Sequence, residues 1–259
     1  MIKSFKLFAI LFTGAILLSS CDSDIPVAQL KTKYLKSNSA FIDIDGVPVH
    51  YIMEGRMDDS LPIVFIHGTS ASLHTWDTLS SLLKPNKKII RLDLPAFGLT
   101  GPNRLNQYNF NFYNQFLDEF LSKLNVTQCI VAGNSLGGSI AWNYAIVSPG
   151  KVKQLILLDA SGYPKKDEKG SLGFKLAAIP VLNQALKHIS PISLIRKSLE
   201  DAFYNKALVT EKMVQQYHDM LLREGNRAAV LELFQHPMKA DATKIKMITQ
   251  PTLIIWGKE

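Results

Sequence analysis

The sequence predicts an α/β fold in which a doubly wound, mostly parallel sheet carries a helical cap inserted between two late strands. The first observation is a set of nearly all-apolar runs of strand length, at residues 63–66, 89–94, 130–132 and 155–158. Such runs are typical of strands covered on both faces. The second is that helix-length segments separate them, at about 72–83, 110–124 and 136–147. Strands that alternate with helices favour a parallel sheet.

The third observation is the helical character of residues 163–248, which carry no convincing strand and are punctuated by prolines. One more strand-like run follows at 251–257. A helical insert in this place would form a lid over the strand ends, where function gathers in such sheets. A hairpin is expected earlier, at 41–45 and 49–53 around Gly46. The predicted division is a signal segment at 1–21, a polar tether at 22–40, the first part of the core at 41–162, the cap at 163–248 and a core continuation at 249–259.

The N-terminal segment has the pattern of a targeting signal. Lys3 and Lys6 precede an apolar stretch at 7–18 that is shorter than the roughly 20 residues of a membrane-spanning helix. The following Leu-Ser-Ser-Cys resembles a bacterial lipobox, which implies lipidation of Cys21; the alternative is a cleaved secretory signal with an incidental cysteine. Asp22, by resemblance to sorting rules, implies the periplasmic face of the inner membrane within the cell envelope.

Composition narrows the function classes. The chain has 259 residues, 47% of them hydrophobic, so it can form a sizeable core. The formal charge is +7, but the basic residues are dispersed and no nucleic-acid-binding motif is present, so a nucleic-acid partner is not expected. A basic surface near an acidic membrane leaflet is the better interpretation. There are two cysteines; with Cys21 lipidated, Cys129 has no partner and is expected to be a buried, inert thiol.

The string Gly133-Asn134-Ser135-Leu136-Gly137 matches G-x-S-x-G between an expected strand and an expected helix. That is the setting in which the motif forms a nucleophile elbow, with Ser135 as the nucleophile. Gly133 and Gly137 avoid clashes at a sharp turn, and the helix N-terminus favours a developing oxyanion. A small-residue turn that only packs the helix is the alternative.

The string His67-Gly68-Thr69 follows the strand at 63–66. Acyl transfer needs two backbone N–H donors for the oxyanion. We expect these to come from Leu136, directly after the nucleophile, and from Thr69. His67 follows the wrong strand for the catalytic base, so a structural role in the loop is favoured over catalysis.

Taken together, residues 41–257 resemble the α/β-hydrolase superfamily, in its cap-bearing branch of esterases, lipases and carbon–carbon bond hydrolases. The similar parts are His67-Gly68-Thr69, Trp76, residues 93–98, the elbow from Gly133 to Gly138, Leu158-Asp159 and residues 251–257. Ala96 departs from the usual glycine. The resemblance implies a small-molecule, ester-like substrate with an apolar acyl part, and no cofactor or metal. Oligomeric state is not indicated.

The same resemblance places the catalytic acid at the first position beyond Glu259 and the base histidine further on. The chain is therefore expected to be a fragment that lacks the base and is inactive by itself. None of the six histidines, at 50, 67, 74, 188, 218 and 236, lies where the base belongs. Asp159, which ends a strand, is an alternative acid by resemblance to some lipases, against a role as a turn residue.

Three functions remain open. The first is hydrolysis of carboxylic esters through an acyl-enzyme. The second is cleavage of carbon–carbon bonds by the same fold, which the string from Asn134 to Gly138 also fits. The third is a membrane-tethered pseudo-hydrolase without activity. Epoxide hydrolases and dehalogenases of this fold usually have Asp as the nucleophile, so Ser135 argues against both.

Overall fold

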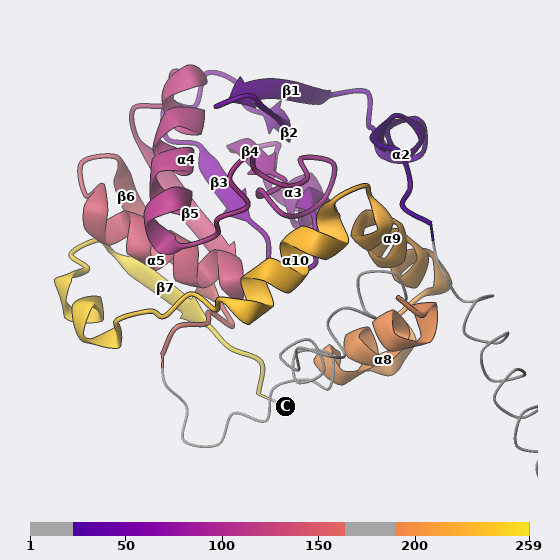
Figure 1. The fold of residues 1–259 in the computed structure, drawn as a ribbon. Helices are drawn as coiled ribbons and strands as arrows, with labels where there is room; N and C mark the ends of the chain where they lie inside the picture. The colour runs from indigo at the N-terminus through magenta and orange to yellow at the C-terminus, as the bar shows by residue number, and fades with distance from the viewer. Residues whose placement is uncertain (1–22, 164–189, 259) are drawn as a thin grey trace, which may run out of the picture.

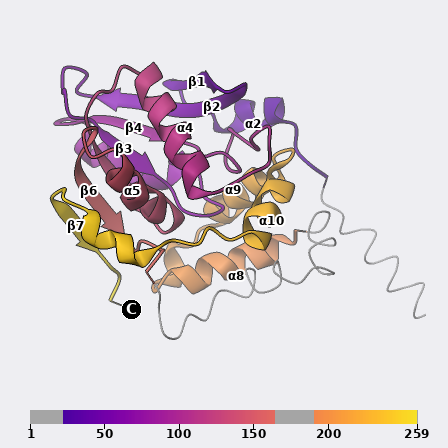
Figure 2. The ribbon, with the colours of Figure 1, turned by 60° about the vertical axis from the view of Figure 1, so that its left-hand side comes forward.

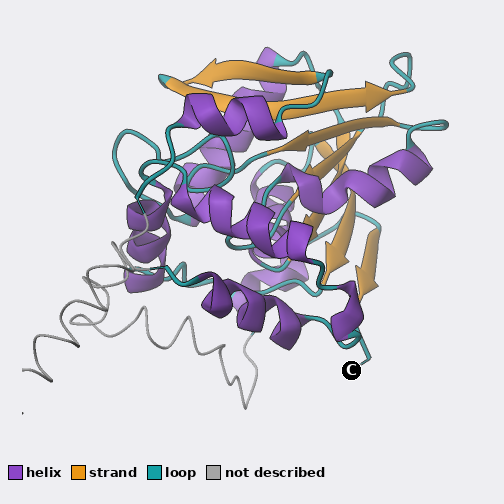
Figure 3. Ribbon diagram, turned by 90° about the vertical axis from the view of Figure 1, so that its right-hand side faces the viewer, coloured by secondary structure: helices purple, strands orange, loops and turns teal. Residues whose placement is uncertain are grey.

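The computed structural model describes residues 23–163 and 190–258. Seven strands form one sheet in the order β1-β2-β4-β3-β5-β6-β7. Figure 3 shows the strands with helices packed around them. Their bounds are β1 Ser39–Ile44, β2 Val47–Gly55, β3 Ile63–Ile66, β4 Lys88–Leu92, β5 Cys129–Asn134, β6 Val152–Leu158 and β7 Thr252–Ile255. The β1–β2 and β2–β4 pairs are antiparallel and the remaining pairs are parallel, as the sequence predicts.

Both faces of the sheet are covered: along its central strands, successive side chains point alternately into two apolar cores, one on each face. Val64 and Val131 point into a large core with helices α4 (Phe110–Lys123) and α5 (Leu136–Val147). Phe65 and Ala132 point into a smaller core with the 3-10 helix η1 (Leu73–Trp76) and helix α3 (Asp77–Leu83). This two-sided burial explains why the strands read as continuous apolar runs.

Three helices gather at one end of the sheet and form the described part of the cap (Figures 1 and 2). They are α8 (Ile192–Ala202), α9 (Glu211–Leu222) and α10 (Asn226–Gln235), with the short η2 (Lys206–Leu208) between the first two. The expected cap extends to residue 248, but η3 (Ala242–Met247) contacts α5, and Ile245 packs on the large core. The segment after α10 therefore returns the chain to the core.

The structure corrects the tether expected at residues 22–40. Helix α2 (Val27–Tyr34) lies within it, and its Leu30 is buried against Leu99 and Met220. The Asp24 carboxylate pairs with Arg227 of α10 at 2.6 Å. A helix of eight residues is unstable alone in water, so its contacts with the cap stabilise it. The polar composition of the segment gave no sign of these contacts.

Strand β7 lies at one edge of the sheet, beside β6. Its residues are exposed, and Leu253, Ile254 and Ile255 are among the largest exposed apolar side chains of the described residues. Within the described residues, no helix is long and apolar enough to cross a membrane. The expected signal segment and Cys21 lie outside the described residues.

Candidate active site

Ser135 lies at the turn between β5 and α5, with φ 51° and ψ −116°. A non-glycine residue with positive φ is strained, and such strain is common at functional sites. The neighbouring glycines permit the turn. A Cβ on Gly133 would lie 2.2 Å from the Gly137 carbonyl oxygen, and a Cβ on Gly137 would lie 2.2 Å from the Ile66 carbonyl oxygen. Only glycine fits at either position, so the elbow is built around Ser135, which is itself half-buried.

Residues with positive φ follow the four neighbouring parallel strands at the same end of the sheet, and three of them are neither Asp nor Asn. Ser70 after β3, Ala96 after β4, Ser135 after β5 and Asp159 after β6 all have positive φ. The carboxyl ends of parallel strands meet at one edge, where such sheets hold their sites. The other non-glycine residues with positive φ are Asp and Asn, which tolerate this region in ordinary turns. The strain therefore points to this edge as the site.

The loop after β3 lies against the nucleophile. A Cβ on Gly68 would be 3.2 Å from the Ser135 Cβ, a tight contact, so glycine lets the loop approach this closely without a shift of its neighbours. Thr69 follows directly. Within the described residues, the backbone N–H groups of Thr69 and Leu136 have no hydrogen-bond partner. Two free donors beside the nucleophile suit an oxyanion hole, and their role remains a prediction.

His67 shapes this loop through both of its ring nitrogens. Nδ1 lies 2.8 Å from the Gly68 carbonyl oxygen, and the Leu94 N–H donates to Nε2 at 3.0 Å. A carbonyl can only accept and an N–H can only donate, so the ring is neutral with its proton on Nδ1. Burial lowers the pKa of His67 and keeps it neutral. Both nitrogens are occupied, which favours the structural role over the role of base.

Asp93 ties the loops around the site together. Its Oδ1 accepts from the Leu73 N–H at 2.7 Å, and its Oδ2 accepts from the Leu99 N–H at 2.8 Å. The His50 ring lies 2.8 Å from Oδ2 and 3.0 Å from the Ser39 hydroxyl. Burial would raise the pKa of Asp93, but His50 and the N–H donors outweigh it and lower the pKa to about 2. The sequence gave Asp93 no role beyond its motif, because its partners are distant along the chain.

Asp159 is exposed at the end of β6, next to the strand end that bears Gly257. Its Oδ1 accepts from the Gly257 N–H at 2.8 Å, and its own N–H donates to the Ile255 carbonyl at 2.9 Å. The carboxylate thus lies on the same sheet edge as the elbow and is bound to backbone there. Its role as alternative acid remains a prediction.

None of the described histidines is hydrogen-bonded to Ser135. His74 lies near Asp77, the His218 Nε2 contacts the Ser190 carbonyl, and His236 pairs with Glu232. His50 and His67 have the partners given above, and His188 lies outside the described residues. Cys129 is buried, and burial raises its thiol pKa to about 12, so it is not a nucleophile at neutral pH. The described residues contain no cluster of three or more His, Cys, Asp or Glu suited to a metal ion.

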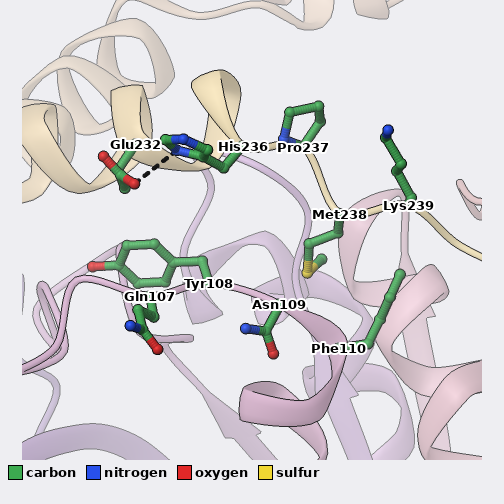
Figure 4. Close-up of a pocket in the computed structure, with 9 residues that line it drawn as sticks. All are labelled: Gln107, Tyr108, Asn109, Phe110, Glu232, His236, Pro237, Met238 and Lys239. Atoms are coloured by element: carbon green, nitrogen blue, oxygen red, sulfur yellow. Dashed lines mark ion pairs between the residues drawn. The ribbon is translucent and has the colours of Figure 1, made fainter.

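Two cavities lie near the cap. The larger, about 450 Å³, is a groove between the start of α4 and the end of α10 (Figure 4). It is lined by Gln107, Tyr108, Asn109, Phe110, Glu232, His236, Pro237, Met238 and Lys239, and none of the predicted site residues lines it. The smaller, about 10 Å³, lies between Ser70 and Ala71 on one side and Met220, Leu221 and Val230 of the cap on the other. The smaller cavity therefore lies beside the loop after β3, residues 67–70, which we call the oxyanion loop after the role predicted for Thr69.

Comparisons with known proteins agree with this fold. The sequence model of a family described as "alpha/beta hydrolase fold" matches residues 62–259. An uncharacterized hydrolase of Bacillus subtilis is 28% identical over 83% of this chain and 78% of its own length. A 2-hydroxy-6-oxo-2,4-heptadienoate hydrolase of Pseudomonas putida is 22% identical over 76% of this chain and 71% of its own. The structure of a meta-cleavage product hydrolase from Pseudomonas fluorescens superposes with a TM-score of 0.69 at 21% identity, over 85% of this chain and 79% of the other.

Proposed function

Because the chain belongs to the α/β hydrolase fold family, we propose that it is a serine hydrolase that cleaves carboxylic esters through an acyl-enzyme on Ser135. Hydrolysis as the class of reaction follows from the family and its relatives. The observation that carries the finer proposal is the strained elbow at Ser135, with the Gly68 loop directly against it.

The proposed chemistry has two steps. The Ser135 Oγ attacks the ester carbonyl carbon and gives its proton to a base, while the Thr69 and Leu136 N–H groups bind the oxyanion. The alcohol leaves with a proton, and water then releases the acid from the acyl-enzyme. We do not assign the role of base to any of the described histidines, because each of them contacts groups other than Ser135.

A fluorophosphonate probe tests the nucleophile, because it forms a covalent bond with an activated serine. In the full-length protein, we expect labelling of the wild type at Ser135, loss of labelling in Ser135→Ala and a fall in turnover on the order of 10⁴-fold or more. Ser161→Ala is the matched control, since the exposed Ser161 hydroxyl donates to the Ser135 carbonyl at 3.1 Å. Labelling at another serine would contradict the assignment.

Cleavage of a carbon–carbon bond is the second candidate, favoured by the printed names of two relatives. The two reactions separate by substrate: p-nitrophenyl butyrate for the ester and a 2-hydroxy-6-oxo-2,4-dienoate for the carbon–carbon bond. A kcat/KM that is higher for the dienoate than for p-nitrophenyl butyrate would favour carbon–carbon bond cleavage over ester hydrolysis. A chain that binds but turns over neither substrate would support the pseudo-hydrolase.

We also propose that Cys21 carries a lipid anchor, on the strength of the lipobox-like string. Asp24, three residues after Cys21, pairs with Arg227 of α10, so such an anchor would hold the cap near the membrane. A palmitate analogue should label the wild type and not Cys21→Ser. Equal labelling of both would exclude the anchor.

A further inference from the structure

One residue that lines the small cavity beside the oxyanion loop has a buried polar side-chain atom without a partner. Asn226, the first residue of α10, is 1% exposed and lines this cavity. Within the described residues, its Oδ1 has no hydrogen-bond partner. Burying an amide oxygen without a partner costs about 1–3 kcal/mol, so such an atom calls for an explanation.

The neighbours fix which way the amide faces. The Asn226 Nδ2 donates to the Gly98 carbonyl at 3.0 Å and to the Met220 carbonyl at 2.7 Å. Both partners are acceptors only, so the nitrogen must face them and the oxygen must face elsewhere. Asn226 therefore presents an acceptor with no donor opposite.

The rest of the cavity has the character of a ligand site. Ala71, Ala96 and Phe97 give it apolar walls, and the Ser70 hydroxyl is its other side-chain polar group. Apolar walls with a few placed polar groups are typical of sites that bind small molecules. The volume of about 10 Å³ suits a single group of the size of water or a hydroxyl.

The cavity is also in the right place to meet a bound substrate. Ser70 is two residues beyond Gly68, which lies against Ser135. Phe97, which also lines the cavity, packs edge-on against His67 with ring centres 5.7 Å apart. A substrate whose carbonyl sits at Thr69 would therefore extend its acyl part past this loop.

We propose that Asn226 is a specificity-determining residue whose Oδ1 accepts a hydrogen bond from a hydroxyl on the acyl part of the substrate. The preferred substrates are then esters of hydroxy acids. This inference rests on the proposed function, because it assumes that the acyl part lies beside Ser135. A site that hydrogen-bonds a substrate hydroxyl discriminates against the analogue without it, because the buried acceptor is then left unpaired.

Equilibrium binding tests the inference without turnover. In the Ser135→Ala background, dissociation constants are measured by NMR titration for methyl butyrate and for the methyl esters of 2-, 3- and 4-hydroxybutyrate. We expect one hydroxy ester to bind about tenfold tighter than methyl butyrate. Asn226→Leu, similar in size but without an acceptor, should bring that ratio to about one.

A second variant covers the case in which Asn226→Leu does not fold. Val230→Leu adds one methylene to the cavity wall and leaves the hydrogen bonds of Asn226 in place. It should also remove the preference, and its melting temperature serves as the folding control. If no hydroxy ester binds tighter than methyl butyrate, the cavity holds water only and the inference is wrong. It is equally wrong if the preference survives in either variant.

The two proposals fail separately. Probe labelling of the wild type reports on Ser135 alone, and the ratio of dissociation constants reports on the cavity alone. Labelling of Ser135 without a hydroxyl preference would overturn only the inference about Asn226. Absence of labelling would overturn the proposed nucleophile, whatever the esters do.

Discussion

Replacement of Asp93 by Asn should destabilise the protein by an amount that the structure allows us to work out. The carboxylate is fully buried and accepts from two N–H groups and the His50 ring. Its pKa falls from 3.8 to about 2, nearly two units. At 1.36 kcal/mol per unit, the ionised form contributes on the order of 2–3 kcal/mol to folding at neutral pH. An Asn side chain keeps only one acceptor oxygen, so its NH₂ group must face a group that donated to the carboxylate. We therefore expect Asp93→Asn to lower the free energy of unfolding by about 3–5 kcal/mol.

The pH dependence gives an independent check of the same magnitude. The folded pKa lies below the unfolded one, so the contribution of Asp93 is complete above about pH 4 and is lost as pH falls towards 2. Asp93→Asn cannot titrate. The difference in unfolding free energy between wild type and variant should therefore be large at pH 7 and shrink between pH 4 and pH 2.

Urea unfolding followed by circular dichroism measures this difference across the pH range. Asp58→Asn is the control, because Asp58 is an exposed carboxylate paired with Arg56, and no comparable change is expected there. A difference below about 1 kcal/mol at pH 7 would refute the role given to Asp93. So would a difference that stays constant down to pH 2, because it would not come from the carboxylate charge.

Three further changes test the loops and the elbow. Gly137→Ala places a Cβ 2.2 Å from the Ile66 carbonyl oxygen and should lower the free energy of unfolding in urea by about 3 kcal/mol. The control is Gly150→Ala, where nothing lies within 4 Å of the added Cβ and the loss of stability should be far smaller. Equal losses in the two variants would contradict the close packing at the elbow. Ala96→Gly relieves a φ of 84° and should raise the melting temperature by roughly 2–4 °C; a fall would mean that Ala96 is not strained. Burial lowers the pKa of His67 below 6.5, so the unfolded chain takes up the proton first and stability should fall below that pH by up to about 1.4 kcal/mol per pH unit. His67→Asn should flatten that slope, and an unchanged slope would assign it to another group.

The strands and the elbow were predictable because their signals are local. The apolar run at 63–66 coincides with β3, and the helix expected at 136–147 coincides with α5. Strand ends differ by a few residues elsewhere, as at β4 (Lys88–Leu92), because a run of apolar residues does not mark where hydrogen bonding stops. The position of Ser135 followed from the order of strand, glycine turn and helix, which the structure reproduces.

The contacts of the cap were not predictable from the sequence. Helix α2 was predicted to be part of a tether, because only Leu30 in it is buried and its Lys33 and Tyr34 side chains contact Asp219, which is 186 and 185 positions away. The sequence gave no sign of a role for Asn226 either, because that role depends on its hydrogen bonds to Gly98 and Met220 and on its place in the small cavity. Such contacts form only when distant segments pack together, and no periodic pattern records them.

The sequence by itself determined the fold class, because hydrophobic period and glycine placement act over a few neighbouring residues. For the same reason it predicted the nucleophile and the residues of the oxyanion loop. Only the tertiary structure decided that His67 has both ring nitrogens occupied and that Asp93 joins three segments. It also decided that Asn226 lies beside the oxyanion loop. The physical reason is that hydrogen bonds and burial depend on which groups meet in space, and several of these groups are far apart in the chain: Leu94 is 27 residues from His67, Leu73 is 20 from Asp93 and Gly98 is 128 from Asn226.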